Sequence, residues 1–142
     1  MINYKFKTTP YKHQLDALQD SWDKENFAYF MEMGTGKSKV LLDNAAMLYD
    51  KGKINGLLII APKGVYKNWY DSEIPTHLPD HIFKKMVLWK TSDKSAKQKN
   101  LLNTLFKTGT EFHILIMNVE AFSSNDGPTF AHKFLSAHNA MI

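Results

Sequence analysis

Short, continuous apolar runs alternate along this chain with segments whose apolar residues recur at helical spacing. The apolar runs cover residues 27–31, 56–62, 86–89 and 112–117, and a further run begins at residue 140. The helical segments lie near residues 11–24, 37–49 and 130–138, and another begins after Ser92 or Ser95 and runs to about residue 106. Short runs without polar alternation are typical of strands buried on both faces of a parallel sheet. Strands that alternate with helices in this way predict an α/β fold with a mainly parallel sheet.

The first predicted helix, near residues 11–24, carries one polar residue of interest beside its apolar face. Its apolar residues Leu15, Leu18 and Trp22 follow the i, i+3, i+7 spacing of one helical face. Gln14 lies next to this face, and its amide carries both a donor and an acceptor, as the edge of an adenine ring requires. From the helix alone, an ordinary surface glutamine is the better interpretation.

Residues 31–38 have the composition of a phosphate-binding loop between a predicted strand and a predicted helix. The glycines of this segment, Gly34 and Gly36, let the backbone turn so that its N–H groups point at phosphates. The N-terminus of the following helix adds partial positive charge at the same place. In such a loop Lys37 would reach the β- and γ-phosphates of a nucleotide, and the Ser38 hydroxyl would ligate Mg²⁺.

One position departs from the usual P-loop pattern, G-x-x-x-x-G-K-[ST]. Its first glycine is replaced by Met31, so the loop depends on Gly34 and Gly36, with Thr35 between them. A glycine-rich turn that binds nothing is the alternative interpretation. The departure favours a class of NTPase with a variant loop over a generic P-loop kinase.

Basic residues are concentrated in the middle of the chain. The net charge is +4, but residues 51–107 hold 11 lysines and four acids, whereas the segments before and after are slightly acidic. This distribution is typical of a protein that binds a polyanion. On charge alone, a solvated lysine-rich face explains it equally well. All 18 basic residues are Lys, so an arginine finger, which stabilises the transferred phosphoryl group in many NTPases, cannot come from this chain.

Composition argues against several other classes of protein. The chain has no Cys, which excludes a disulfide framework and a thiolate metal site. His77 and His81 have the spacing of a metal pair, but Pro79 lies between them, so we do not expect them to share a helical face. No apolar run approaches the ~20 residues of a membrane span. We expect a cytoplasmic protein.

Four segments carry a resemblance to one family. Residues 10–14 read Pro-Tyr-Lys-His-Gln, and residues 32–38 read Glu-Met-Gly-Thr-Gly-Lys-Ser. Residues 57–69 form a predicted strand, a proline and then Asn-Trp on a predicted helix, and residues 116–120 read Ile-Met-Asn-Val-Glu. Together they resemble the Q motif, motif I, motif Ia and the Thr-x-Tyr-Glu segment of superfamily 2 helicase-like ATPases. The similarity is to the Swi/Snf-type branch with its phage and bacterial members, whose motif I also lacks the first Walker glycine.

The resemblance implies a RecA-like P-loop NTPase domain of three αβα layers, spanning residues 1–142 as a single, incomplete domain. It implies that Gln14 reads adenine and that ATP and Mg²⁺ are held by the loop residues Gly34, Thr35, Gly36, Lys37 and Ser38. In this scheme Lys37 is the catalytic residue and Ser38 the Mg²⁺ ligand. In the family, motif Ia and the segment that corresponds to residues 116–120 lie against DNA. The resemblance therefore implies that the candidate contacts to the backbone of double-stranded DNA are Lys63, Asn68 and Asn118.

The family's Walker B carboxylates would follow the strand that begins at Ala140, and the second RecA-like domain with its arginine finger would come later. We therefore expect the first part of a motor that couples ATP hydrolysis to movement on nucleic acid, in a bacterium or a phage-infected host cell. An absent arginine finger alone costs about 10³–10⁵ in rate. This part should bind ATP without useful turnover until the missing C-terminal domain completes it.

Two other functions stay open. The chain could be a nucleic-acid-binding or regulatory module whose P-loop is vestigial, in which case DNA binding would ignore nucleotide. It could also be a small P-loop kinase, although we find no Arg-bearing lid segment.

Overall fold

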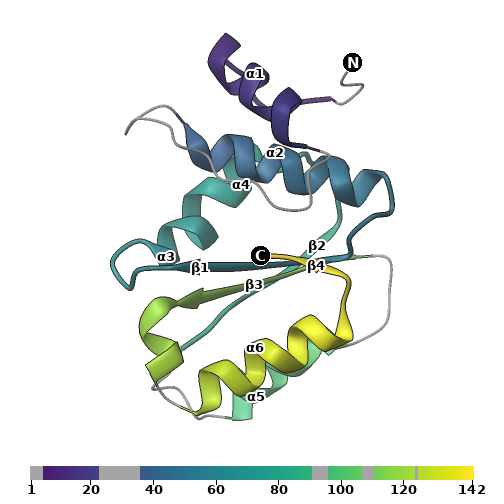
Figure 1. Cartoon of the computed structure of the whole chain (residues 1–142). Helices are drawn as coiled ribbons and strands as arrows, with labels where there is room; N and C mark the ends of the chain where they lie inside the picture. The colour runs from purple at the N-terminus through teal and green to yellow at the C-terminus, as the bar shows by residue number, and fades with distance from the viewer. Residues whose placement is uncertain (1–4, 23–35, 91–95, 107–110, 124) are drawn as a thin grey trace.

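The computed structural model describes residues 5–22, 36–90, 96–106, 111–123 and 125–142, in which helices and strands alternate (Figure 1). The strands are β1 (Gly56–Ala61), β2 (Lys84–Leu88), β3 (Phe112–Asn118) and β4 (Ala140–Met141). The α-helices are α1 (Lys12–Ser21), α2 (Lys37–Asp50), α3 (Tyr66–Asn68), α4 (Ile74–His77), α5 (Ala96–Asn103) and α6 (Asp126–Ala137). Shorter helices of other types are the π-helix η1 (Trp69–Glu73) and the 3₁₀-helices η2 (Thr104–Phe106) and η3 (Val119–Ser123).

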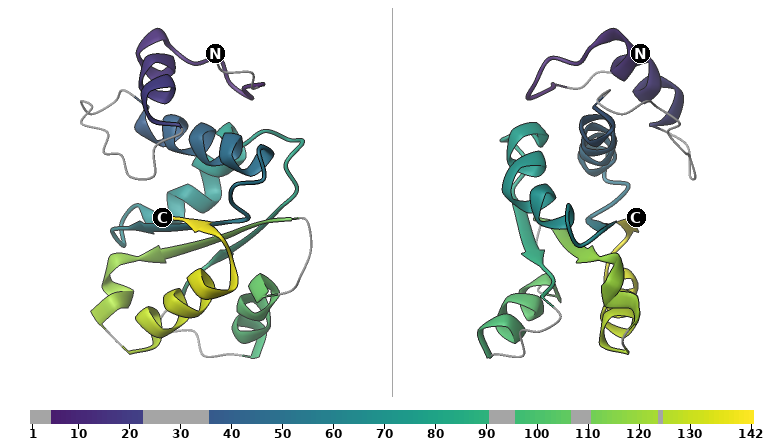
Figure 2. Two further views of the ribbon diagram at one scale, coloured as in Figure 1. Left: turned by 45° about the vertical axis from the view of Figure 1, so that its right-hand side comes forward. Right: turned by 90° about the vertical axis from the view of Figure 1, so that its left-hand side faces the viewer.

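The strands form one sheet in the order β2-β3-β1-β4, and every neighbouring pair is parallel. Helices α2, α3 and α4 cover one face, α5 and α6 cover the other, and α1 lies outside α2 (Figures 1 and 2). The predicted α/β class with a parallel sheet between helical layers is therefore confirmed. The predicted strand at 27–31 lies outside the described residues.

Strand β3 is the centre of the molecule, and all seven of its residues are buried. Because side chains alternate across a strand, β3 contributes to the hydrophobic clusters on both faces of the sheet. Phe112, Ile114 and Ile116 pack with α2 and α4 on one face, and Leu115 and Met117 pack with α6 on the other. The predicted strand at 112–117 is confirmed and extends by one residue.

Strand β1 is less buried than the sequence predicts. Its continuous apolar run indicated burial on both faces, yet Ile59 is half-buried and Ile60 is 41% exposed. The reason is that β4 pairs only with Gly56 and Leu57, so the second half of β1 has no strand on that side among the described residues. An open apolar hollow of about 250 Å³ results. It is lined by Leu41, Leu42, Leu57, Leu58, Ile59, Ile60, Trp69, Met141 and Ile142.

The connection from β1 to β2 is helical over most of its length. Between α3 and α4 the chain widens into η1, where the Ile74 N–H bonds to the Trp69 carbonyl five residues back. Pro75 follows at once. It has no N–H, and in a regular helix its ring would clash with the carbonyl of Asp71, so the wider turn accommodates it.

Helix α6 begins at Asp126, four residues before the predicted start. Pro128 lies in its first turn, and because the first four N–H groups of a helix have no partner within it, proline is tolerated there. Gly127 is required for another reason. A Cβ at this position would lie 2.1 Å from the Ala121 carbonyl oxygen, so only glycine lets α6 pack so closely on η3.

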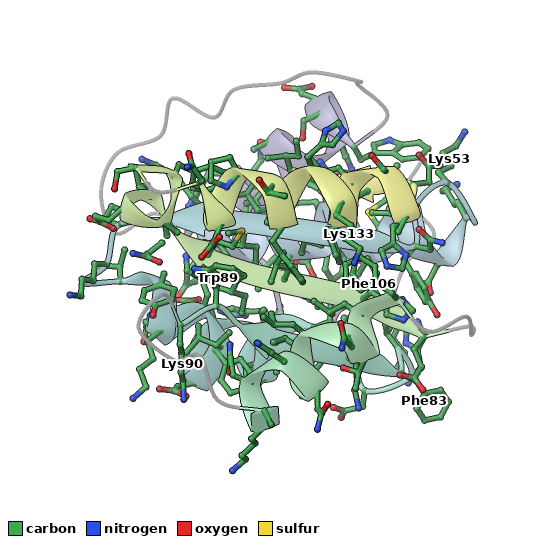
Figure 3. All side chains as sticks on the ribbon, turned by 90° about the horizontal axis from the view of Figure 1, so that it is seen from below. Lys53, Phe83, Trp89, Lys90, Phe106 and Lys133 are labelled. Atoms are coloured by element: carbon green, nitrogen blue, oxygen red, sulfur yellow. The ribbon has the colours of Figure 1, made fainter. Side chains whose placement is uncertain are left out.

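On the sheet face that α5 and α6 cover, aromatic rings pack together and a lysine lies over one of them (Figure 3). The Phe130 ring lies 5.2 Å from that of Trp89 and 5.4 Å from that of Phe106, between centroids. Lys133 Nζ lies 4.7 Å above the Phe106 ring.

Within the described part of the chain, no helix combines the length and apolar character needed to cross a membrane.

Candidate functional site

The described part of the predicted phosphate loop forms the start of α2. Gly36 is the N-cap residue, with φ of +79°, in the left-handed region that favours glycine. Lys37 and Ser38 follow in the first turn and are half-buried. Gly34 and Thr35 lie outside the described residues. The structure therefore places three of the five predicted loop residues, and all three are at a helix N-terminus.

Helix α2 directs this N-terminus toward the carboxyl edge of the sheet. It runs antiparallel to β1 (Figure 1). At its end, the Tyr49 ring lies 4.8 Å from that of Phe112, where β3 begins. At its start, Leu41 lines the same hollow as Ile60, where β1 ends. The carboxyl edge is where open parallel sheets bind ligands.

Gln14 is buried against this helix start. Only 5% of the residue is exposed, so the expectation of an ordinary surface glutamine is wrong. Its Oε1 accepts a hydrogen bond of 2.8 Å from the Tyr11 N–H, and its Nε2 donates to the Gly36 carbonyl oxygen over 3.4 Å. A Cβ on Gly36 would lie 2.1 Å from Gln14 Nε2. Glycine at position 36 is thus needed both for its backbone angle and for the approach of Gln14.

The start of α2 carries groups that could hold a phosphate and a cation. Since Gly36 has no side chain, it cannot cap the first N–H groups of α2, and those groups are the ones that bind phosphate at helix N-termini. The first turn of α2, which the structure describes in full, carries no acidic residue to repel an anion. Lys37 brings the positive charge and Ser38 a hydroxyl suited to Mg²⁺.

Helix α1 is held on α2 by an apolar cluster of its own. Leu18 packs against Val40 and Met47, with Phe6 and Trp22 at the margin. Because α1 covers the outer side of α2, burial extends around α2 beyond a single stripe.

Two charged residues of α2 are buried beneath this contact. Lys39 Nζ and Asp43 Oδ2 are 2.7 Å apart, and their side chains are only 5% and 2% exposed. The Phe6 ring covers the ammonium group, 5.1 Å from Nζ to the ring centroid. This buried pair was not predicted from the sequence. Its signal was the i, i+4 spacing of opposite charges, which is more often a solvent-exposed pair.

The segment before α1 is fastened to α4 and the loop after it. Lys7 Nζ lies 2.7 Å from Asp80 Oδ1 and donates to the Pro75 carbonyl oxygen over 2.8 Å. Thr8 Oγ1 and His77 Nδ1 share a hydrogen bond of 2.9 Å. Burial lowers the pKa of His77, and the neighbouring Glu73 carboxylate opposes this effect.

A second group of polar residues lies where β1 and β3 end. Lys63 follows β1 and is exposed, whereas Asn118, the last residue of β3, is buried. The strand register pairs Ala61 with Asn118, so the two predicted nucleic-acid contacts come from adjacent strand ends. Between them lies Glu120, to which the sequence analysis gave no role although it stands only two residues after Asn118.

Asn68, the third predicted nucleic-acid contact, is exposed on α3, where its Nδ2 donates to Glu73 Oε1 over 3.5 Å. Two lysines of the basic segment 51–107, Lys53 and Lys90, lie too far apart to form a single patch. Lys53 precedes β1 and Lys90 follows β2, so they lie at opposite ends of the sheet (Figure 3). Lys63 and Lys67 are both exposed beyond the end of β1.

Among the residues that the structure describes, no three His, Asp or Glu side chains are placed to hold a metal ion together. No protein-family model matches the chain, and no curated protein is significantly similar to it.

Proposed function

We propose that this chain is the ATP-binding N-terminal part of a helicase-like ATPase, of the Swi/Snf-type branch of superfamily 2, that acts on double-stranded DNA. Its fold would then be RecA-like. The observation that carries the proposal is the contact between Gln14 and Gly36. The two residues are 22 positions apart in the sequence. The contact places an amide that can read a base beside the start of α2, where the predicted phosphate loop ends.

The same contact suggests how ATP is read. The Gln14 hydrogen bond to the Gly36 carbonyl is long, at 3.4 Å, and is weaker than the 2.8 Å bond from the Tyr11 N–H. An adenine edge can replace it, while the 2.8 Å bond from Tyr11 keeps the amide oriented. Lys37 would then bind the β- and γ-phosphates. Ser38 would ligate Mg²⁺, which neutralises phosphate charge when bound.

The nucleic-acid part of the proposal depends on the exposed lysines beyond β1. Lys63 and Lys67 can contact phosphates, which fixes position on the duplex without reading sequence. Such binding weakens as salt rises, because each phosphate contact releases condensed counterions.

The test is calorimetric titration of Mg·ATP into the wild-type protein and into Lys37→Ala. We measure binding because a P-loop can hold a nucleotide without the catalytic acids of a complete motor. We expect Lys37→Ala to bind at least about tenfold more weakly, a loss of about 1.4 kcal/mol. Lys97→Ala, an exposed lysine on α5, is the matched control and should bind as the wild type does.

Gln14→Ala separates adenine reading from phosphate binding. If Gln14 reads the base, this variant should lose preference for ATP over GTP while it still binds triphosphate. Equal ATP affinity in wild type and Lys37→Ala would contradict the proposal. No ATP binding by a folded protein that binds DNA would instead favour the vestigial P-loop.

A further inference from the structure

The carboxylate of Glu120 connects the two strand ends of the carboxyl edge. The backbone N–H of Lys63 donates to Glu120 Oε1 over 3.4 Å, across 57 positions of sequence. The Asn118 Nδ2 donates to Glu120 Oε2 over 3.2 Å. Each carboxylate oxygen thus takes a donor from a different segment, one after β1 and one at the end of β3.

Glu120 is exposed, so its hydrogen bonds rather than packing determine where its carboxylate lies. A hydrogen bond from its own backbone N–H lowers the pKa of its carboxyl group most strongly, and the bonds from Lys63 and Asn118 act in the same direction. The group is therefore ionised at neutral pH and accepts from all three donors.

Asn118 is committed to this arrangement. The residue is 6% exposed, and its Nδ2 already donates to Glu120. Its Oδ1 is buried and has no hydrogen-bond partner among the described residues. Because Asn118 is buried and one of its amide N–H groups already bonds Glu120, it is better placed to orient Glu120 than to meet a phosphate from solvent.

The loop that carries Lys63 is also fixed on its other side. The N–H groups of Val65 and Tyr66 both donate to the Pro62 carbonyl oxygen, over 2.9 Å. The Tyr66 hydroxyl then donates to the Trp89 carbonyl oxygen over 3.1 Å, at the end of β2. The loop is therefore joined by Tyr66 to the residue that follows β2 and by Glu120 to η3, which follows β3.

We propose that Glu120 is a positioning residue for the nucleic-acid interface: it fixes the loop after β1 so that Lys63 and its neighbours meet the phosphate backbone. The inference rests on the nucleic-acid part of the proposed function. It is unexpected on charge alone, because a carboxylate beside a polyanion repels it. Only its geometric role gives Glu120 a favourable effect on binding.

The test is the affinity for a fluorescent random-sequence DNA duplex, measured by anisotropy at several salt concentrations. The variants are Glu120→Gln, Glu120→Ala and Glu111→Ala, which removes an exposed acid just before β3, at the opposite end of that strand. Charge alone predicts that all three variants bind DNA more tightly than the wild type. Positioning predicts that Glu120→Ala binds several-fold more weakly, with a salt slope lower by about one for each lost phosphate contact.

Glu120→Gln loses the same charge but keeps one oxygen acceptor, so it should bind more tightly than Glu120→Ala. Amide hydrogen exchange gives a readout without DNA. The Lys63 N–H should exchange faster in Glu120→Ala than in the wild type, with the urea midpoint of unfolding unchanged.

The outcomes separate this inference from the proposed function. If the wild type binds DNA and Glu120→Ala binds as tightly as Glu111→Ala or more so, the inference is overturned and the proposed function is not. If the wild type shows no salt-dependent binding, the nucleic-acid part of the proposed function fails and the inference fails with it.

Discussion

Gly36 and Gly52 are the two described residues with clearly positive φ, +79° and +72°, and they differ in their surroundings. A Cβ would meet Gln14 at Gly36 but nothing within 4 Å at Gly52. We predict that Gly52→Ala lowers the free energy of unfolding by about 1–2 kcal/mol, the cost of a left-handed residue with a side chain. Gly36→Ala should lose more, because it also displaces a buried amide.

Urea unfolding of both variants measures the difference. Adding Gln14→Ala to Gly36→Ala should remove the excess loss, because the displaced amide is then absent. If the excess persists in the double variant, the contact between Gln14 and Gly36 is not its source. The pair therefore tests, at the scale of single residues, the contact on which the proposed nucleotide site depends.

At the scale of one element, α2 offers a matched comparison with α1. Both helices carry a Lys and an Asp at i, i+4, but Lys39–Asp43 is buried and Lys12–Asp16 is 89% and 56% exposed. We predict that Asp43→Ala lowers the free energy of unfolding by about 3–5 kcal/mol, because it leaves a buried ammonium uncompensated. Asp16→Ala should change it by no more than about 0.5 kcal/mol.

Replacing both partners tests the physical reason. Lys39→Met with Asp43→Leu should recover most of the loss, since an apolar pair needs no desolvation of charge. Chemical denaturation measures all three variants. A double variant as unstable as Asp43→Ala would show that the lost stability came from packing or from another partner of Asp43.

At the scale of the whole molecule, His77 lies where the N-terminal segment meets α4. Its pKa is lowered in the folded protein, chiefly by burial, with Lys39 adding to the shift while Glu73 and Asp43 oppose it. A lowered folded-state pKa gives stability that is fully present above the unfolded value of about 6.5 and is lost as pH falls through the folded pKa. We predict a lower urea midpoint at pH 5.5 than at pH 7.5, and a smaller difference in His77→Gln.

Thr8→Val provides the control for His77. It removes the hydrogen bond to His77 without removing the titrating ring, so it should lower the midpoint at both pH values and keep the difference between them. A pH dependence in His77→Gln equal to that of the wild type would assign the effect to other groups.

Prediction from sequence succeeded where a local pattern was sufficient. The runs at 56–62 and 112–117 became β1 and β3, because a short apolar segment between helices is most readily buried as a strand of a sheet. It failed where packing decided the outcome. Gln14 lies on the polar margin of α1, and only the position of α1 on α2 buries it. The exposure of Ile60 likewise depends on how far β4 extends along β1.

The sequence by itself determined the α/β class, the helix that begins at Lys37 and the chemistry available at its start, because hydrophobic period and residue type are local properties. The strand order, the burial of Lys39 and Asp43, and the bridge from Glu120 to Lys63 were decided only by the tertiary structure. These features join residues on separate elements or depend on what covers an element. Which surfaces meet is set by the packing of whole helices and strands, so no local pattern encodes it.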